Sequence, residues 1–169
     1  MVDRMHPLAK STSGSPDCPV AQLVALPPIG RLIIRSDGTA LASIGFEVPD
    51  ICRATLSGGR SLLRLGPDEF LLLTSDNRAP ALASAVDVSH RDTALTVSGQ
   101  RATWVINTFC ALDLHQAAFP VGMCTRTLLG KAEIVLWRTG AEIFRIEVAR
   151  SFAPYVWACL EEARREFLG

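Results

Sequence analysis

The apolar positions of this chain fall into short runs that are separated by glycine, proline and aspartate. Runs of branched and large apolar residues between such turn residues are typical of β-strands, and they occupy residues 31–36, 60–65, 69–75, 132–138 and 142–148. Four of the runs form two close pairs, joined by Gly66-Pro67-Asp68 and by Thr139-Gly140-Ala141. Because these residues favour tight turns, the pattern predicts two β-hairpins.

Alternation within the last run predicts which side of that strand is buried. Phe144, Ile146 and Val148 alternate with Arg145 and Glu147. Since successive side chains of a strand point to opposite faces, we expect one packed face and one face exposed to water.

Apolar residues at helical spacing predict four helices. A short helix is expected at 39–46 with Asp37 as its N-cap, an alanine-rich helix at 79–86, and a third within 100–114. The last helix is expected to begin at Ser151 as its N-cap and to tolerate Pro154 in its first turn. Its apolar stripe consists of Phe152, Val156, Leu160, Ala163 and Phe167.

Residues 86–97 alternate in the manner of a strand and contain the three residue types of an acyl-transfer triad, Asp87, Ser89 and His90. In an extended strand Asp87 and Ser89 point to one face and His90 to the other, so the base is turned away from its supposed partners. The glycine-flanked nucleophile turn of many hydrolases is absent from the sequence as well. A structural histidine at a strand end or an interface is the better interpretation, and we expect no catalytic residue here.

The predicted order of strand, helix, hairpin and helix occurs twice along the chain. Gly66 and Phe70 precede Gly140 and Phe144 by 74 residues. This pattern favours an α+β fold of two pseudo-repeated sheet-and-helix units.

The same pattern gives the expected domain organisation. We expect a flexible N-terminal tail at 1–19 and a single α+β domain at 20–169, with halves at about 20–86 and 87–169. The second half carries about 13 additional residues, most naturally at 110–123. This insertion is either a contact surface or a loop that covers its own core.

Composition and charge exclude several classes of protein. Of the 169 residues, 49% are hydrophobic and 20% are charged, which is ample for a folded core. The 17 basic and 17 acidic residues cancel, so the electrostatic attraction that drives nucleic-acid binding is missing. No stretch has the roughly 18 uninterrupted apolar residues of a membrane span, and the polar N-terminus is not a secretory signal.

The sequence carries no recognisable cofactor or metal motif. It contains neither a GxGxxG after a strand nor a P-loop. The five cysteines are odd in number and lack CxxC spacing, which disfavours disulfides and structural zinc and suits a reducing cytoplasm. Asp113 and His115 are too few for a zinc site. We expect the tryptophans mainly in the core, with one or two available for an interface: Trp104, Trp137 and Trp157.

Four stretches resemble a known family, and they occupy residues 65–73, 86–120, 124–138 and 144–163. They are similar to the gamma subunit of bacterial heterotetrameric sarcosine oxidase, which belongs to the superfamily of folate-dependent aminomethyltransferases such as the glycine-cleavage T protein. The resemblance implies the folate-binding aminomethyltransferase fold. The most specific segments are ALDLHQAAFP at 111–120 and RSFAPYVW at 150–157.

The resemblance implies a subunit of an oxidoreductase complex and not a self-sufficient enzyme. The complex of that family converts sarcosine to glycine and passes the one-carbon unit to tetrahydrofolate. Its FAD, FMN, NAD, tetrahydrofolate and zinc belong to the alpha, beta and delta subunits, whereas gamma holds no cofactor and packs chiefly on alpha.

We therefore expect a non-catalytic, cytoplasmic assembly subunit. Its candidate interface residues are His90, Arg91, His115, Phe119 and Arg150. A permanent apolar interface fits the mean hydropathy of +0.25, and the isolated chain is expected to be poorly soluble or to self-associate. The alternative is a stand-alone folate-binding or one-carbon-transfer protein of the same superfamily. A small hydrolase built around His90 and a self-associating structural protein are more distant possibilities.

Overall fold

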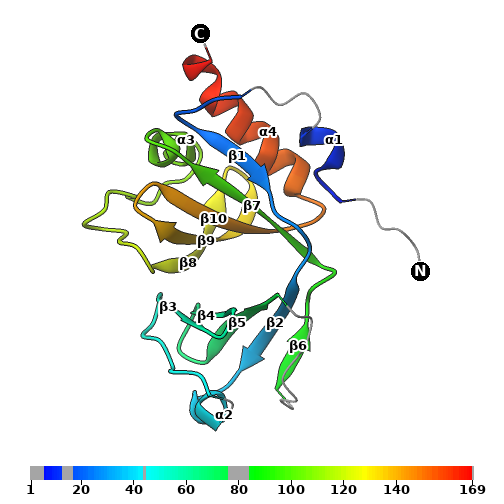
Figure 1. Cartoon of the computed structure of the whole chain (residues 1–169), viewed down its shortest axis with the longest axis vertical. Coiled ribbons are helices and arrows are strands. Elements are labelled where there is room, and N and C mark those ends of the chain that lie inside the picture. Colours follow the sequence, from blue (N-terminus) through cyan, green and yellow to red (C-terminus); the bar gives the residue numbers. More distant parts are fainter. Residues whose placement is uncertain (1–5, 13–16, 44, 76–83, 169) are drawn as a thin grey trace.

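The structure, a computed structural model, describes residues 6–12, 17–43, 45–75 and 84–168. Within these residues the chain forms two antiparallel sheets of five strands each and four short α-helices (Figure 1). The predicted α+β class is therefore confirmed.

The first sheet, sheet A, belongs mainly to the second half of the chain. Its strands follow the spatial order β1-β7-β10-β9-β8. They span β1 (Gln22–Ala25), β7 (Asp92–Ser98), β8 (Cys124–Leu129), β9 (Ala132–Gly140) and β10 (Ile143–Ala149).

The second sheet, sheet B, is built from the first half of the chain. Its order is β3-β4-β5-β2-β6. It contains β2 (Gly30–Arg35), β3 (Ala54–Ser57), β4 (Arg60–Arg64), β5 (Glu69–Thr74) and β6 (Ala85–Asp87). Both predicted hairpins are confirmed as β4–β5 and β9–β10.

β1, from the first half, lies in sheet A, and β6, which spans the boundary between the halves, lies in sheet B. β1 precedes β2 in the chain but pairs with β7, whereas β6 precedes β7 but pairs with β2. The two sheets are further joined where Arg53 bridges Met123, with the Cys124 amide donating to the Cys52 carbonyl. The halves therefore share strands and do not form independent sheets.

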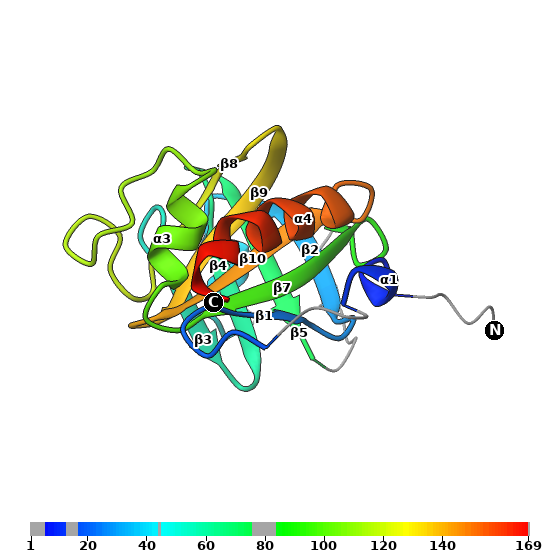
Figure 2. The ribbon, with the colours of Figure 1, turned by 90° about the horizontal axis from the view of Figure 1, so that it is seen from above.

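The layers of the fold follow from the apolar faces of these strands. The largest core cluster lies between sheet A and the helices α3 (Ala102–Asn107) and α4 (Ala153–Arg164). A second cluster lies between the two sheets, and a third joins the outer face of sheet B to α2 (Thr39–Ser43). Figure 2 shows α3 and α4 side by side over sheet A.

Several predicted helices differ in extent from the structure. The helix within 100–114 is only α3, and α4 begins after Phe152, with no side-chain cap from Ser151. Phe152 is exposed and not part of the buried stripe, whereas Pro154 does lie in the first turn as predicted. The predicted helix at 79–86 falls largely outside the described residues, and its last two residues begin strand β6.

The segment predicted as a flexible tail contributes to the core where the structure describes it. Leu8, just before α1 (Ala9–Thr12), and Cys18 are buried in the core cluster between sheet A and the helices α3 and α4. The His6 ring also lies 3.0 Å from the Leu26 carbonyl oxygen. These residues therefore pack onto the domain instead of extending from it.

Candidate functional site

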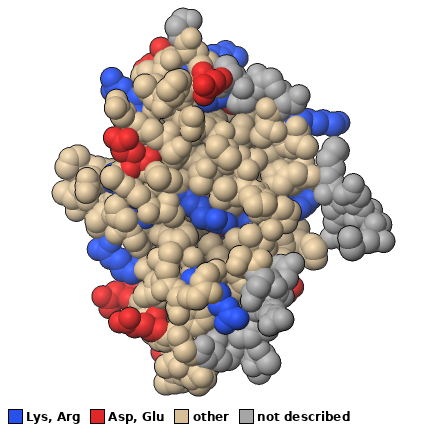
Figure 3. All heavy atoms as spheres, in the orientation of Figure 1, with Lys and Arg blue, Asp and Glu red and all other residues tan. Residues whose placement is uncertain are grey.

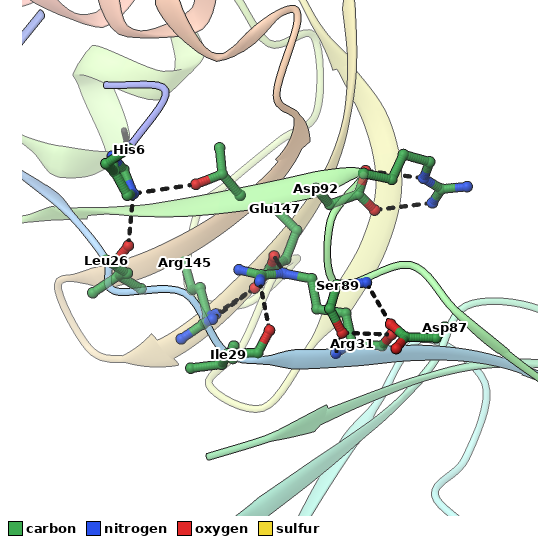
Figure 4. Close-up of polar contacts among 11 residues, drawn as sticks. His6, Leu26, Ile29, Arg31, Asp87, Ser89, Asp92, Arg145 and Glu147 are labelled. Carbon is green, nitrogen blue, oxygen red and sulfur yellow. Dashed lines mark hydrogen bonds and ion pairs between the residues drawn. The ribbon is translucent and has the colours of Figure 1, made fainter. Parts of the chain in front are cut away.

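The Asp87, Ser89 and His90 segment is a turn and not a continuous strand. β6 ends at Asp87 and β7 starts at Asp92, so the predicted single strand at 86–97 is wrong. The turn is closed by the Asp87 carboxylate, which accepts the Ser89 amide at 2.8 Å (Figure 4). Hydrogen bonds from Ser89 hold the pKa of Asp87 below its usual value.

The Ser89 hydroxyl is occupied by structural hydrogen bonds. It accepts the Arg31 backbone amide at 2.8 Å, which ties the turn to β2. His90 is exposed, and within the described residues no hydrogen bond joins it to Ser89. The three residues border a hollow of about 240 Å³, but a nucleophile held by a base is not what this geometry provides.

A buried ionic cluster joins the two sheets close to this turn (Figure 4). Arg31 on β2 and Glu147 on β10 are 1% and 4% exposed and form an ion pair of 2.6 Å. Arg145 donates to the second Glu147 oxygen at 2.7 Å. Two cations thus share one carboxylate, and removing Glu147 would leave both guanidinium groups without their counter-charge between the sheets.

This cluster overturns the expected exposed face of the last strand. Glu147 is buried and Arg145 is largely covered, because sheet B packs against the face that alternation assigned to water. The sequence feature that could have indicated the cluster is Arg31 at the start of the run at 31–36, together with a carboxylate on a second strand. Alternation alone cannot tell a wet face from a face that meets another sheet.

A second group of charges lines the groove between the sheets on another side. Arg126 pairs with Glu69 and Glu133, and Arg35 pairs with Glu69 and Asp68. The groove includes hollows of about 200 and 340 Å³. Because these charges satisfy one another at the surface, the group is better suited to fixing the two sheets than to binding a ligand.

The predicted interface residues fall into two groups. His90, Arg91 and Arg150 lie together, since the Arg150 amide donates to the Arg91 carbonyl at 3.0 Å. The Arg91 guanidinium pairs with Asp92 at 2.9 Å. Arg150 also interacts within the chain.

The other two predicted residues lie in the long loop between α3 and β8, which we call loop 108–123. His115 is exposed, and its amide donates to Asp113 at 2.8 Å. Phe119 is only 2% exposed, so its side chain does not reach the surface where a partner would lie. Its burial beneath the loop supports the reading of 110–123 as a segment that covers core.

Arg138 holds this loop from below and was missed in the sequence. Its Nη1 donates to the carbonyls of Leu114 and Phe119 at 3.1 and 2.9 Å. The side chain is 5% exposed, and its guanidinium lies 5.0 Å from the centre of the Phe144 ring. The sequence feature that could have indicated this role is the position of Arg138, a lone arginine at the end of an apolar strand run and just before the hairpin turn.

Loop 108–123 meets the first half of the chain at the junction of the sheets. The Ala54 amide donates to the Gly122 carbonyl at 3.0 Å, beside the Arg53–Met123 bridge. Exposed apolar side chains flank the junction: Ile51, Leu56 and Val121. At this junction, segments of both halves present apolar groups to solvent.

The thiols and the metal-ligating residues give no sign of a redox or metal centre. Four of the five cysteines are buried, and all are free. Burial raises the pKa of Cys124 to about 12, so its thiol is inert near neutral pH. In the part of the chain that the structure describes, no three histidine, cysteine or acidic residues are grouped for a metal, and no helix is long and apolar enough to span a membrane.

Comparisons of the sequence with known proteins identify its relatives. A family model described as "Sarcosine oxidase, gamma subunit family" matches residues 37–166. The chain is 34% identical over 121 residues to sarcosine oxidase subunit gamma of Corynebacterium sp. strain U-96, and 32% identical over 119 residues to that of Arthrobacter sp.. These alignments cover 64% of this chain but only 58% and 59% of the relatives.

Two solved structures are similar in fold. A chain of the heterotetrameric sarcosine oxidase from Corynebacterium sp. U-96, in complex with pyrrole 2-carboxylate, matches with a TM-score of 0.86 and 26% identity. That match covers 98% of this chain and 97% of the other. The glycine cleavage system aminomethyltransferase T of Bartonella henselae matches with a TM-score of 0.63 and 13% identity over 83% of this chain and 45% of that protein, which shows a shared fold alone.

Proposed function

This chain belongs to the sarcosine oxidase gamma subunit family, and we propose that it is the non-catalytic gamma subunit of a heterotetrameric sarcosine oxidase complex. The observation that carries the proposal is the match over 98% of the chain to a heterotetrameric sarcosine oxidase, at a TM-score of 0.86. The complex would oxidise sarcosine to glycine, and the one-carbon unit would pass to tetrahydrofolate.

In this proposal the chemistry belongs to the other subunits. FAD, FMN, NAD, tetrahydrofolate and zinc would be held by alpha, beta and delta, and this chain would pack chiefly on alpha. The proposal is supported by the internal use of the polar groups described above, since Ser89, Glu147 and Arg138 all serve contacts within the chain. A stand-alone folate-binding or one-carbon-transfer protein is not favoured, because the matched relatives are named as gamma subunits.

The physical role of such a subunit is to stabilise its partner. A protein that binds only the folded form of another shifts the folding equilibrium of both toward the folded state. The group formed by His90, Arg91 and Arg150, together with His115, remains our proposal for polar contacts at the rim of the interface.

The pseudo-repeat proposed from the sequence is supported by the strand orders. Read from opposite ends, β3-β4-β5-β2 of sheet B corresponds to β8-β9-β10-β7 of sheet A. The exchanged strands β6 and β1 then occupy equivalent edges. We infer that each half is one copy of a common unit, with one strand exchanged between the copies.

Affinity purification tests the proposed function directly. The chain would be tagged in its native cell, purified under mild conditions and analysed for co-eluting proteins and flavin absorbance, with an unrelated tagged protein of similar size as control. We expect three further subunits and bound flavin to co-elute with this chain and not with the control protein. Recovery of the tagged chain without a flavin-bearing partner would overturn the proposal.

A further inference from the structure

Three buried N–H groups lie between the two sheets without a hydrogen-bond partner. Among the described residues, five buried side-chain nitrogen or oxygen atoms lack such a partner, and three of them are Arg31 Nη2, Arg145 Nη2 and Trp137 Nε1. Arg145 and Trp137 are directly opposite each other on β10 and β9, so their side chains share one face of sheet A. Arg31 reaches that face from sheet B through its ion pair with Glu147. The fold therefore gathers three unpartnered side-chain donors in one region.

The same region carries an excess of positive charge. Arg31 Nε donates to one Glu147 oxygen at 2.6 Å, and Arg145 Nε donates to the other at 2.7 Å (Figure 4). Arg145 Nη2 also lies 2.7 Å from that second oxygen, but it makes no hydrogen bond with it. Two guanidinium groups thus face one carboxylate, which leaves one positive charge between the sheets. Glu69 in the neighbouring groove does not cancel this charge, because it pairs with arginines of its own.

These donors and this charge match a carboxylate group. A buried water has two lone pairs, so it would leave the third N–H without an acceptor and the excess charge in place. A carboxylate carries one negative charge, and its two oxygens accept about four hydrogen bonds. Its planar shape also fits the fork of a guanidinium group. A dianion such as phosphate would reverse the charge of the region instead of neutralising it.

Arg145 connects the region to the surface. Its side chain is 17% exposed, whereas Arg31 and Trp137 are 1% and 6% exposed. The hollow of about 200 Å³ in the groove between the sheets extends to Glu147, so there is space beside the cluster for a small group. Figure 3 shows basic side chains at the centre of the visible face, between the two sheets, and acidic ones nearer its edges. This distribution favours the approach of an anion to the junction.

We propose that Arg31, Arg145 and Trp137 form a binding site for a carboxylate group between the two sheets. The carboxylate belongs either to a small free acid or to an aspartate or glutamate of a partner protein, since the two sources share one chemistry. Bound there, it gives the unpartnered N–H groups an acceptor and neutralises the excess charge. The site is a property of this chain's own residues, so it goes beyond the proposed function.

Sodium acetate is the probe for the site. The chain would be melted in increasing acetate, with the ionic strength held constant by sodium chloride. Because a ligand that binds the folded form stabilises it, we expect the melting temperature of the wild type to rise saturably by about 3 °C. Arg145→Gln removes the excess charge and leaves the Arg31–Glu147 pair intact, so its rise should be below about 1 °C. Arg35→Gln is the matched control, because it removes a surface guanidinium that also pairs with carboxylates, and it should respond as the wild type does.

The indole N–H resonance of Trp137 locates the binding in the wild-type chain. It would be assigned by its loss in Trp137→Phe and followed through the same titration, whether or not Arg145→Gln folds. We expect it to shift with the saturation curve of the melting temperature. The resonance of Trp157, whose N–H also lacks a partner among the described residues, should stay in place. Equal temperature rises in the wild type and Arg145→Gln, or a Trp137 resonance that does not move, would overturn the site.

The flavin-bearing complex, purified from cells that lack this chain, distinguishes the two sources of the carboxylate. If a partner subunit supplies it, saturating acetate should weaken binding of the wild-type chain to the complex at least about 10-fold, and Arg145→Gln should bind that much more weakly than Arg35→Gln. If a free acid supplies it, acetate should change this affinity by less than about 2-fold. Either result supports the site once the isolated chain has responded to acetate. Only this comparison rests on the proposed function: failure of the wild-type chain to bind the complex would overturn that function and leave the carboxylate site standing.

Discussion

In each of the two hairpins, β4–β5 and β9–β10, an arginine side chain makes the same kinds of contact, but the two arginines differ in burial. Arg64 ends β4 and donates to the carbonyls of Gly66, Pro49 and Pro67. Its guanidinium lies 5.4 Å from the centre of the Phe70 ring. In each hairpin the guanidinium therefore holds the turn ahead of it, a preceding loop, and a phenylalanine face.

The second hairpin repeats every contact of the first and adds one. Arg138 donates to the carbonyls of Gly140 and Ala141 in its turn, as Arg64 does to Gly66 and Pro67. It holds two carbonyls of the preceding loop where Arg64 holds only that of Pro49. The longer loop also covers the side chain, so a half-buried arginine in one half is a buried one in the other.

This difference shows what the longer loop adds. The core of each hairpin is complete with the short loop, since Phe70 and Phe144 are both fully buried. The additional residues bring a second carbonyl to the arginine and an exposed surface to the molecule. The insertion thus changes the surface of the second half while the hairpin beneath it keeps the same construction.

Replacing each arginine by methionine should give the largest effect and quantify the comparison. Methionine keeps much of the volume but removes every hydrogen bond, so Arg138→Met leaves two buried loop carbonyls without donors. We expect a loss of about 3–5 kcal/mol in the free energy of unfolding for Arg138→Met and about 1–2 kcal/mol for Arg64→Met, measured by pulse proteolysis in urea. Equal losses at the two sites would show that the loop contacts of Arg138 add no stability.

Two glycines at equivalent turns should give the next largest effect. Gly38 and Gly99 follow β2 and β7, have φ of 99° and 116°, and accept the first helical amide from Leu41 and Ala102. A Cβ at Gly99 would lie 2.6 Å from the Val20 carbonyl oxygen, whereas at Gly38 it would lie 3.2 Å from a Val48 side-chain carbon. Backbone atoms cannot move aside as a valine side chain can, so the turn at Gly99 should tolerate a Cβ less well than the turn at Gly38.

We therefore expect Gly99→Ala to cost about 3 kcal/mol and Gly38→Ala about 1–2 kcal/mol, of which the left-handed backbone accounts for a similar part in each. Urea unfolding of both variants beside the wild type would measure the difference. A larger loss for Gly38→Ala would mean that the segment before β1 moves more freely than its contacts indicate.

The sequence predicted the parts of the fold that depend on neighbouring residues. Both hairpins, β2 and the start of helix α2, where Asp37 accepts the Thr39 amide, follow from local patterns of turn and apolar residues. The strands β1, β3 and β8 were missed. β1 and β3 are only four residues long, and all three lie at sheet edges, where long-range pairing and not local propensity decides.

The candidate site was predictable only in part, for the same reason. The turn at Ser89 contains neither glycine nor proline. An aspartate that accepts the amide two residues ahead is a local turn signal, but the alternating apolar pattern of this segment led to its prediction as a strand. The burial of Arg31 and Glu147 depends on the meeting of two sheets, 116 positions apart in the chain. Arg164 is likewise buried and donates to the Ala21 carbonyl at 3.1 Å, because the segment leading into β1 lies against α4.

The N-terminal ends of α2 and α3 provide the test with the smallest expected effect. The Asp37 carboxylate accepts the Thr39 amide at 3.0 Å and its hydroxyl at 2.7 Å, whereas α3 begins without a side-chain cap. The hydrogen bonds from Thr39 lower the pKa of Asp37. A carboxyl whose folded pKa is depressed stabilises the protein above its unfolded pKa, and this contribution is lost as the pH falls through the folded value.

Asp37→Ala should therefore lower the melting temperature near neutral pH by less than Gly38→Ala does, and the difference from the wild type should vanish as the pH falls below about 4. Ser98→Ala, at the equivalent position before Gly99, is the control and should shift the melting temperature equally at both pH values, because no carboxylate is removed. A pH-independent loss in Asp37→Ala would mean that the side chain acts through packing and not through its charge. In that case the two helix entrances would differ in shape alone, and acid would weaken both halves of the molecule to the same extent.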